Sequence, residues 1–303
     1  MKRDYIKQLD IQISNVCNLQ CKHCVMKNSM TGEPVDFDEI EKVINDHPEI
    51  EDIFLTGGEP LLIDNERLLE LISNHPNIEW MCSTNLIYEL TPIRIELIKK
   101  INSVATSFDI GIRFGNVRNL SLWYHNVKRL INDNIKPELE VYVTLTKQVL
   151  EISPFRWKRF FDKLGICEYK YRMLGMSELV YKHPEIIPTK EEFVKFMNEM
   201  LDVKDYEKNM YPLFIKNKYM HYCNYTHITP MRPDGKMQEC IFAECYDCNC
   251  KIAPECLPCK YYQYCGGRCP LRPCMFDIDV YNRVVEEYKD DVNFPIMGRY
   301  REG

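Results

Sequence analysis

Short apolar segments alternate with amphipathic segments over the first two thirds of the chain. Six apolar segments are rich in β-branched and aromatic residues, as is typical of strands; they cover residues 9–14, 52–56, 78–84, 103–108, 139–146 and 169–174. The segments between and after them repeat their apolar residues with a helical period; they cover residues 36–46, 67–74, 92–101, 120–133, 154–164 and 190–201. This alternation predicts an α/β fold whose parallel sheet has right-handed crossovers.

Two prolines support the predicted helix starts. Thr91-Pro92 and Ser153-Pro154 each place a capping residue before a proline. Proline suits the first helical position because its fixed backbone angle is already helical and its missing N–H would have no partner there. We therefore expect helices to begin at Pro92 and Pro154.

Three closely spaced cysteines follow the first predicted strand. Cys17, Cys21 and Cys24 have the spacing C-x3-C-x2-C. A four-iron cluster needs four ligands, so a loop that offers three thiolates leaves one iron open for a ligand that is not protein. Taken alone, this spacing also suits part of a zinc knuckle or of a disulfide framework.

A glycine pair follows the second predicted strand. That strand runs directly into Gly57, Gly58, Glu59 and Pro60, one helix downstream of the cysteines. Glycines let the backbone approach a ligand closely, and a carboxylate accepts hydrogen bonds from an ammonium group. In this order, the cysteine motif and the Gly-Gly-Glu-Pro element together resemble the radical SAM superfamily.

This resemblance implies a partial (β/α)6 TIM-like barrel over residues 1–205, with active residues at the carboxyl ends of the strands. In that superfamily the open iron binds S-adenosylmethionine (SAM), whose reductive cleavage gives a 5′-deoxyadenosyl radical that abstracts hydrogen. The Gly-Gly-Glu-Pro element, here Gly57, Gly58, Glu59 and Pro60, holds the methionine amino group.

The resemblance also extends to other residues that contact the cofactor. The ends of the third and fourth strands bind its ribose hydroxyls and carboxylate, and the corresponding residues here are Ser83, Asn85, Ser107, Asp109 and Arg113. His23 is expected to touch the adenine through its backbone. The alternative for Ser83 and Asn85 is that they only close a loop.

A second array of cysteines begins near residue 220. Ten of the fifteen cysteines fall between Cys223 and Cys274. The spacing from Cys223 through Gly235 and Cys240 to the later cysteines resembles a SPASM domain, which we assign to residues 206–303. Residues 233–236, Pro-Asp-Gly-Lys, predict a hairpin turn that folds Cys240 back toward Cys223.

The SPASM resemblance implies two auxiliary 4Fe–4S clusters. Its pattern assigns one cluster to Cys256, Cys259, Cys265 and Cys274, and the other to Cys223, Cys240 and Cys269. The fourth ligand of the latter stays open: it is Cys245, Cys248 or Cys250, or the iron is open to substrate. A zinc ribbon is the alternative for this region. Outside both arrays, Cys82 and Cys167 are predicted to be small core residues.

Composition limits the classes of function and the cellular environment that we expect for this protein. The 303 residues, 45% apolar and 28% charged, are ordinary for a globular protein. A net charge of −6 argues against broad nucleic-acid binding, which needs a surplus of Lys and Arg. Neither a membrane span nor a signal peptide is recognisable, which predicts a cytoplasmic location without membrane contact. Fifteen cysteines in that setting predict metal binding and a reducing or anaerobic environment.

Three hypotheses about function follow. The first is a SPASM-type radical SAM oxidoreductase that crosslinks, epimerises or dehydrogenates a peptide or peptide-like precursor, with flavodoxin or ferredoxin as electron donor. The second is oxidation or epimerisation of a small polar molecule such as an aminosugar. The third is an iron–sulfur electron-transfer protein, in which the Gly-Gly-Glu-Pro element would have no purpose.

Overall fold

Seven parallel strands form one curved sheet in the computed structural model, which describes residues 6–24, 26, 32, 34–203, 228–237, 253–261 and 274–287. The strands are β1 (Gln8–Gln12), β2 (Asp52–Thr56), β3 (Glu79–Thr84), β4 (Ser103–Phe108), β5 (Glu140–Leu145), β6 (Glu168–Met173) and β7 (Ile228–Met231). Their order across the sheet is β6-β5-β4-β3-β2-β1-β7. The first six are the strands that the sequence predicts, and parallel pairing is confirmed.

The seventh strand was not predicted. β7 pairs in parallel with β1, from Gln8 opposite Ile228 to Ile11 opposite Met231. The segment is only four residues long and contains Pro230, which cannot donate a ladder hydrogen bond. It is tolerated here because β7 is the edge strand of the sheet, and among the described residues its other side is bridged only at Met231, by Met237.

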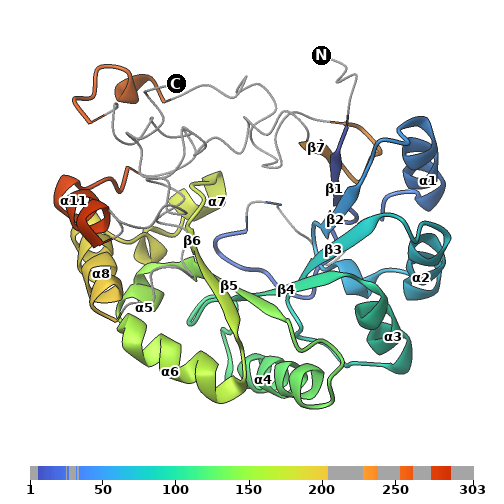
Figure 1. Cartoon of the computed structure of the whole chain (residues 1–303), viewed down its shortest axis with the longest axis horizontal. Coiled ribbons are helices and arrows are strands. Elements are labelled where there is room, and N and C mark those ends of the chain that lie inside the picture. Colours follow the sequence, from blue (N-terminus) through green and yellow to red (C-terminus); the bar gives the residue numbers. More distant parts are fainter. Residues whose placement is uncertain are drawn as a thin grey trace.

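The helices lie on the convex side of the sheet, as Figure 1 shows. Between the strands run α1 (Phe37–Asp46), α2 (Asn65–Asn74), α3 (Pro92–Lys100), α4 (Val117–Asn132) and α6 (Pro154–Leu164), and after β6 comes α8 (Lys190–Asp202). Shorter elements are α5 (Lys147–Leu150), α7 (Glu178–Tyr181) and the 3-10 turns η1 (Pro60–Leu62), η2 (Pro184–Ile186) and η5 (Pro254–Cys256). The last helix, α11 (Ile278–Glu287), is joined to α8 by Arg283, which donates to Asp202 at 2.8 Å.

The predicted helix starts are confirmed at Pro92 and Pro154. Thr91 and Ser153 occupy the capping positions, but neither side chain makes a capping hydrogen bond. The side chains that do cap are found elsewhere. Asp64 accepts from the first turn of α2, and Thr189 forms a reciprocal capping box with Glu192 at the start of α8.

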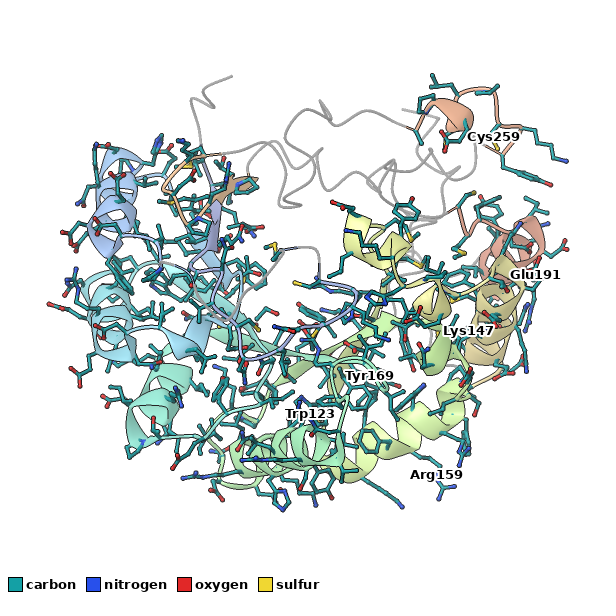
Figure 2. All side chains as sticks on the ribbon, turned by 180° about the vertical axis from the view of Figure 1, so that it is seen from behind. Trp123, Lys147, Arg159, Tyr169, Glu191 and Cys259 are labelled. Atoms are coloured by element: carbon teal, nitrogen blue, oxygen red, sulfur yellow. The ribbon has the colours of Figure 1, made fainter. Side chains whose placement is uncertain are left out.

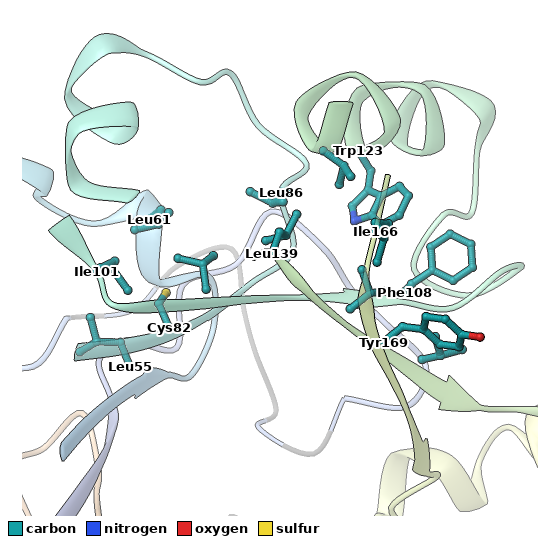
Figure 3. Packing of buried hydrophobic residues seen from close by; sticks show 14 of the residues in the cluster. Leu55, Leu61, Cys82, Leu86, Ile101, Phe108, Trp123, Leu139, Ile166 and Tyr169 are labelled. Atoms are coloured by element: carbon teal, nitrogen blue, oxygen red, sulfur yellow. The ribbon is translucent and has the colours of Figure 1, made fainter. Parts of the chain in front are cut away.

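The hydrophobic core fills the space between the sheet and the helices. Figure 3 shows Phe108, Trp123 and Tyr169 packed there, with ring centroids of Phe108 and Trp123 4.9 Å apart. Cys82 is buried in this core as predicted, whereas the prediction for Cys167 was wrong. Cys167 is exposed and lies in the connection between α6 and β6, where its Sγ is 3.8 Å from Gly165 O.

The turn predicted at residues 233–236 is confirmed. Arg232 N donates to Lys236 O at 3.0 Å, and Met231 pairs with Met237 in an antiparallel bridge. Gly235 has a φ of +75°, which favours glycine at this position. The turn follows directly from β7.

Part of the predicted C-terminal domain lies outside the described residues. This applies to the boundary near residue 205 and to Cys223, Cys240, Cys245, Cys248, Cys250, Cys265 and Cys269. Within the described residues, no helix has the length and apolar character needed to span a membrane.

Candidate active site

The three N-terminal cysteines lie in the loop that follows β1, on the concave side of the sheet (Figure 1). Cys17 and Cys21 are buried and Cys24 is half-buried. Cys24 N donates to Cys21 O at 3.0 Å, which makes a tight turn between the last two thiols. Burial raises the pKa of Cys17, and burial raises that of Cys21 to about 11. A metal ligand must be a thiolate, so metal binding here would release protons.

Backbone hydrogen bonds join this loop to the turn after β2. Gly58 N donates to Ser14 O at 2.6 Å, and Glu59 N donates to Val16 O at 2.7 Å. The two glycines permit this approach: a Cβ on Gly57 would lie 2.5 Å from Ser14 O, and one on Gly58 would lie 2.0 Å from Val16 O. The glycines thus admit the cysteine loop, and the expected approach of a ligand to them stays a prediction.

Glu59 is buried behind this junction, with 1% of its surface exposed. Its Oε1 accepts from Thr84 Oγ1 at 2.6 Å and from Leu61 N at 3.3 Å, and its Oε2 accepts from Asn85 N at 2.6 Å. Burial raises the pKa of Glu59 to about 7, although these hydrogen bonds lower it. The carboxyl group is therefore fixed in position and suited to an approaching cation.

Asn85 connects Glu59 to the cysteine loop. Its Nδ2 donates to Asn18 Oδ1 at 2.9 Å and lies 3.9 Å from Cys17 Sγ. Asn18 in turn donates to Ile87 O at 2.6 Å. Asn85 also accepts from Ile87 N, so the loop-closing role considered for it is confirmed alongside its contact with the site.

Sequence reasoning missed Thr84, Tyr88 and Asn18. Thr84 stands between Ser83 and Asn85, and its hydroxyl bonds Glu59 and also the Tyr88 hydroxyl at 2.6 Å. Side chains alternate between the two faces of a sheet, so Thr84 and Ser83 point in opposite directions. This alternation was the signal that could have identified Thr84 from the sequence. Ser83 and Ser107 are half-buried on their strands, and within the described part of the chain no hydrogen bond links them to this network.

Asp109, Arg113 and His23 form a second buried group. Asp109 accepts from Arg113 N at 2.8 Å and from Arg113 Nε at 3.0 Å. His23 Nε2 lies 3.4 Å from Asp109 Oδ2 and 3.3 Å from Arg113 Nη2. Burial lowers the pKa of Arg113, but Asp109 and the nearby Cys21 thiol raise it by more, so the guanidinium stays charged.

The expected contact of the His23 backbone with the adenine stays a prediction, and the His23 side chain also lies in this group. Its ring is buried, and burial lowers its pKa, which favours the neutral imidazole. Within the described residues, its Nδ1 has no hydrogen-bond partner. The His23 side chain thus leaves one ring nitrogen available beside the cysteines.

Three of the predicted auxiliary ligands fall within the described residues. Cys256 is buried, Cys259 is half-buried and Cys274 is exposed. Cys259 N donates to Cys256 O at 3.1 Å, so the C-x2-C pair forms a turn. Among the described residues these three are not grouped as ligands of one metal ion, and Cys265, which is assigned to the same cluster, lies outside them.

The N-terminal residues fit the group that the motif implies. No three Cys, His, Asp or Glu side chains in the described ranges are grouped as ligands of a single metal ion. A four-iron cluster is larger than one ion and spaces its thiolates more widely, and Cys17, Cys21 and Cys24 come from one loop with no fourth cysteine in it. Glu59 and the unpartnered His23 Nδ1 add polar atoms on the same side.

Known proteins resemble this chain in sequence and in fold. The uncharacterized protein MJ0907 of Methanocaldococcus jannaschii is 26% identical over 71% of this chain and 75% of its own length. A GTP 3′,8-cyclase of Clostridium perfringens is 24% identical over 80% of this chain and 83% of its own length. Native anSMEcpe with bound AdoMet and Cp18Cys peptide superposes with a TM-score of 0.65, at 15% identity, over 93% of this chain and 96% of that one.

The family comparison covers the part of the chain that holds the site. The profile described as Radical SAM superfamily matches residues 11–143. That range includes the cysteine loop, Glu59, Asn85, Asp109 and Arg113. Residues 11–143, which hold the candidate site, therefore match the radical SAM superfamily domain.

Proposed function

We propose that this enzyme is a SPASM-type oxidoreductase that abstracts hydrogen from a peptide or peptide-like precursor. The observation that carries the proposal is the hydrogen-bonded junction between the cysteine loop and the turn after β2. It fixes three thiols and the buried Glu59 carboxyl on one side of the sheet, at the carboxyl ends of β1 and β2.

Cys17, Cys21 and Cys24 are the proposed ligands of the 4Fe–4S cluster that binds SAM. When both are bound, they supply one-electron cleavage of the sulfonium and a 5′-deoxyadenosyl radical. The electron comes from a donor such as flavodoxin or ferredoxin. The protein contributes orientation and exclusion of water, for which the buried positions of Cys17 and Cys21 are suited.

Glu59 is the proposed acceptor for the amino group of SAM. Oε1 already accepts from both Thr84 and Leu61, whereas Oε2 accepts from Asn85 and keeps a lone pair for a further donor. A bound ammonium group lowers the pKa of Glu59 from about 7, because an opposite charge favours the carboxylate. Gly57, Gly58 and Pro60 shape the turn that presents this residue.

The remaining cofactor contacts are proposed from the strand ends. Arg113 is charged and has Nη atoms beyond its bond to Asp109, so it is suited to the carboxylate of SAM. Asn85, Ser83, Ser107 and Asp109 are assigned to the cofactor on the strength of the resemblance. His23 offers its unpartnered Nδ1 to the adenine side.

Residues 206–303 would hold two auxiliary 4Fe–4S clusters, which would supply an electron acceptor for oxidation of the substrate. The spacing of Cys256, Cys259, Cys265 and Cys274, and of Cys223, Cys240 and Cys269, supports them. The fourth ligand of the second cluster stays a choice among Cys245, Cys248, Cys250 and substrate.

The peptide substrate is supported by the fold neighbour that was solved with a bound peptide. A small polar substrate is the second candidate, and the similarity to a GTP 3′,8-cyclase over 80% of this chain favours it. A test incubates the reduced, reconstituted enzyme with SAM and either a peptide encoded beside the gene or an aminosugar. Formation of 5′-deoxyadenosine with a mass change on the peptide supports the first candidate, and turnover of the aminosugar alone supports the second.

An electron-transfer protein without radical chemistry remains the competing class. The triple variant Cys17→Ala, Cys21→Ala, Cys24→Ala separates it from the enzyme. Loss of SAM cleavage in that variant supports the proposal, and cleavage that survives the triple change contradicts the assignment of the cluster.

A further inference from the structure

Two basic residues of β6 face away from the helices. Tyr169 packs outward against Phe161 of α6, with ring centroids 4.7 Å apart, and Tyr171 packs against Phe196 of α8 at 5.3 Å. Because side chains alternate along a strand, Lys170 and Arg172 lie on the opposite, concave face of the sheet.

Arg172 is stacked on a tyrosine of the neighbouring strand. Its Cζ lies 3.4 Å from the centroid of the Tyr142 ring, close enough for a strong cation–π contact. Its Nε is buried and has no hydrogen-bond partner among the described residues. A buried guanidinium N–H without a partner is costly, so this donor is positioned for a group that the described chain does not supply.

The charged groups near Arg172 do not pair with it in the part of the chain that the structure describes. Lys170 is paired with Glu140, and Tyr142 is kept neutral because burial raises its pKa. Glu168 lies on the same face but at the opposite, amino-terminal end of β6, so Arg172 at the carboxyl end has no ion-pair partner among the described residues.

The cysteine loop reaches the same side of the sheet. Lys22 Nζ lies 2.8 Å from Glu185 Oε1, which ties the loop after β1 to η2, the 3-10 turn that follows β6. Figure 1 shows this loop inside the curve of the sheet. Arg172 is the penultimate residue of β6, so it lies near the carboxyl edge that the loop spans.

We propose that Arg172, held by stacking on Tyr142, binds an anionic group of the substrate, a carboxylate or a phosphate. The proposal rests on the radical SAM function above and adds the chemical class of the substrate. A planar guanidinium suits both anions because it donates two parallel hydrogen bonds. The site is distinct from Arg113, which is bonded to Asp109 and assigned to the cofactor.

Calorimetric titration tests this on the reconstituted enzyme saturated with SAM, without reductant. The probes are N-acetylglycine, its neutral amide N-acetylglycinamide, and inorganic phosphate. We expect one or both anions to bind saturably and the amide not to bind. Arg172→Gln should weaken anion binding about ten-fold or more, since a charged hydrogen bond is lost. Arg172→Lys keeps the charge and should weaken it less.

Arg159→Gln is the matched control. Arg159 also stacks on an aromatic ring, that of Phe155 at 5.8 Å, but it is exposed on α6 and points outward in Figure 2. This variant should bind the anions as the unchanged enzyme does. Binding of N-acetylglycine alone identifies a carboxylate, and binding of phosphate alone identifies a phosphoryl group.

Three results would overturn the proposal: neither anion binds, Arg172→Gln binds anions normally, or Arg172→Gln instead weakens SAM binding. If Arg172→Gln does not fold, Arg172→Lys decides, and unchanged anion affinity in it contradicts bidentate recognition. Failure of the proposed radical function has a different readout. In that case none of these proteins forms 5′-deoxyadenosine under reducing conditions, whatever the result of the anion titrations.

Discussion

Gly58 and Val16 lie so close that a Cβ on the glycine would sit 2.0 Å from the valine carbonyl oxygen. This approach brings the turn after β2 against the loop that carries the cysteines, and it permits the hydrogen bonds from Gly58 N to Ser14 O and from Glu59 N to Val16 O. The same short segment thus supplies the buried carboxyl and the surface on which the cysteine loop rests.

Gly58→Ala is expected to push the cysteine loop away. The added methyl group cannot avoid backbone atoms, so we expect a loss of about 1–3 kcal/mol in unfolding free energy and weaker SAM binding. Urea titration and SAM titration measure the two effects. Gly115→Ala is the control, since the nearest atom to its Cβ would be Ile112 O at 3.8 Å. Equal behaviour of the two variants would contradict this role for Gly58.

Thr84→Val is expected to disturb Glu59 without changing side-chain volume much. It removes the hydroxyl that donates to Glu59 and leaves the buried Tyr88 hydroxyl without that partner. We expect a stability loss of about 1–3 kcal/mol and a further rise in the pKa of Glu59. SAM affinity should fall with it.

Thr106→Val provides the comparison for Thr84→Val. Thr106 is also fully buried, and its hydroxyl accepts from Trp123 Nε1 at 3.1 Å; among the described residues it makes no hydrogen bond with Glu59. Loss of the Thr106 hydroxyl should lower stability but leave SAM affinity unchanged. If SAM affinity falls equally in both variants, the effect is general and the Thr84–Glu59 bond has no special function.

Asp10 is expected to make stability depend on pH. Burial raises its pKa to about 6 in the folded protein, although the hydrogen bond from Gln8 lowers it, and the ordinary value is 3.8. The folded state therefore holds this proton more tightly than the unfolded chain. The contribution of protonated Asp10 to the unfolding free energy is therefore fully present below pH 4 and is lost as pH rises through about 6.

Asp10→Asn removes this dependence and keeps the shape of the side chain. We expect the variant and the unchanged protein to be similar at pH 4, and the variant to be more stable by on the order of 2–3 kcal/mol at pH 8. Urea titrations across this range measure the difference. A difference that stays constant with pH would show that Asp10 does not titrate in this way.

Iron content is expected to show how much of the bound iron each of the two cysteine arrays holds. In the triple variant of Cys17, Cys21 and Cys24 to alanine, the auxiliary clusters should remain, so about two thirds of the iron and sulfide should be retained. Anaerobic metal and sulfide assays measure this. Protein that carries zinc in place of the remaining iron would support the zinc-ribbon alternative instead.

The strands and helices of the sheet were predictable because their signals are local. Segment 154–164 begins with a proline and is followed by Gly165, and its apolar residues repeat with the helical period. Its bounds therefore match those of α6. β7 gave no such signal, because four residues with a central proline look like a loop until β1 is known to have a free edge. Cys167 was misplaced because burial changes within one residue of a strand end.

The candidate site was predictable in its motifs and less so in its contacts. Cys17, Cys21, Cys24 and Glu59 follow from spacing. The bonds from Thr84 and Asn85 to Glu59 join residues on different strands, and sequence separation hides them. The role of the glycine pair was also hidden, because the partner that approaches Gly58 is a carbonyl oxygen far earlier in the chain.

Electron paramagnetic resonance of the reduced, reconstituted enzyme, recorded before and after addition of SAM, tests the central claim most directly. If Cys17, Cys21 and Cys24 hold a cluster with one iron open to the cofactor, the spectrum should change on addition of SAM, and the change should be absent in the triple alanine variant. A spectrum that SAM leaves unaltered in the unchanged enzyme would contradict the account.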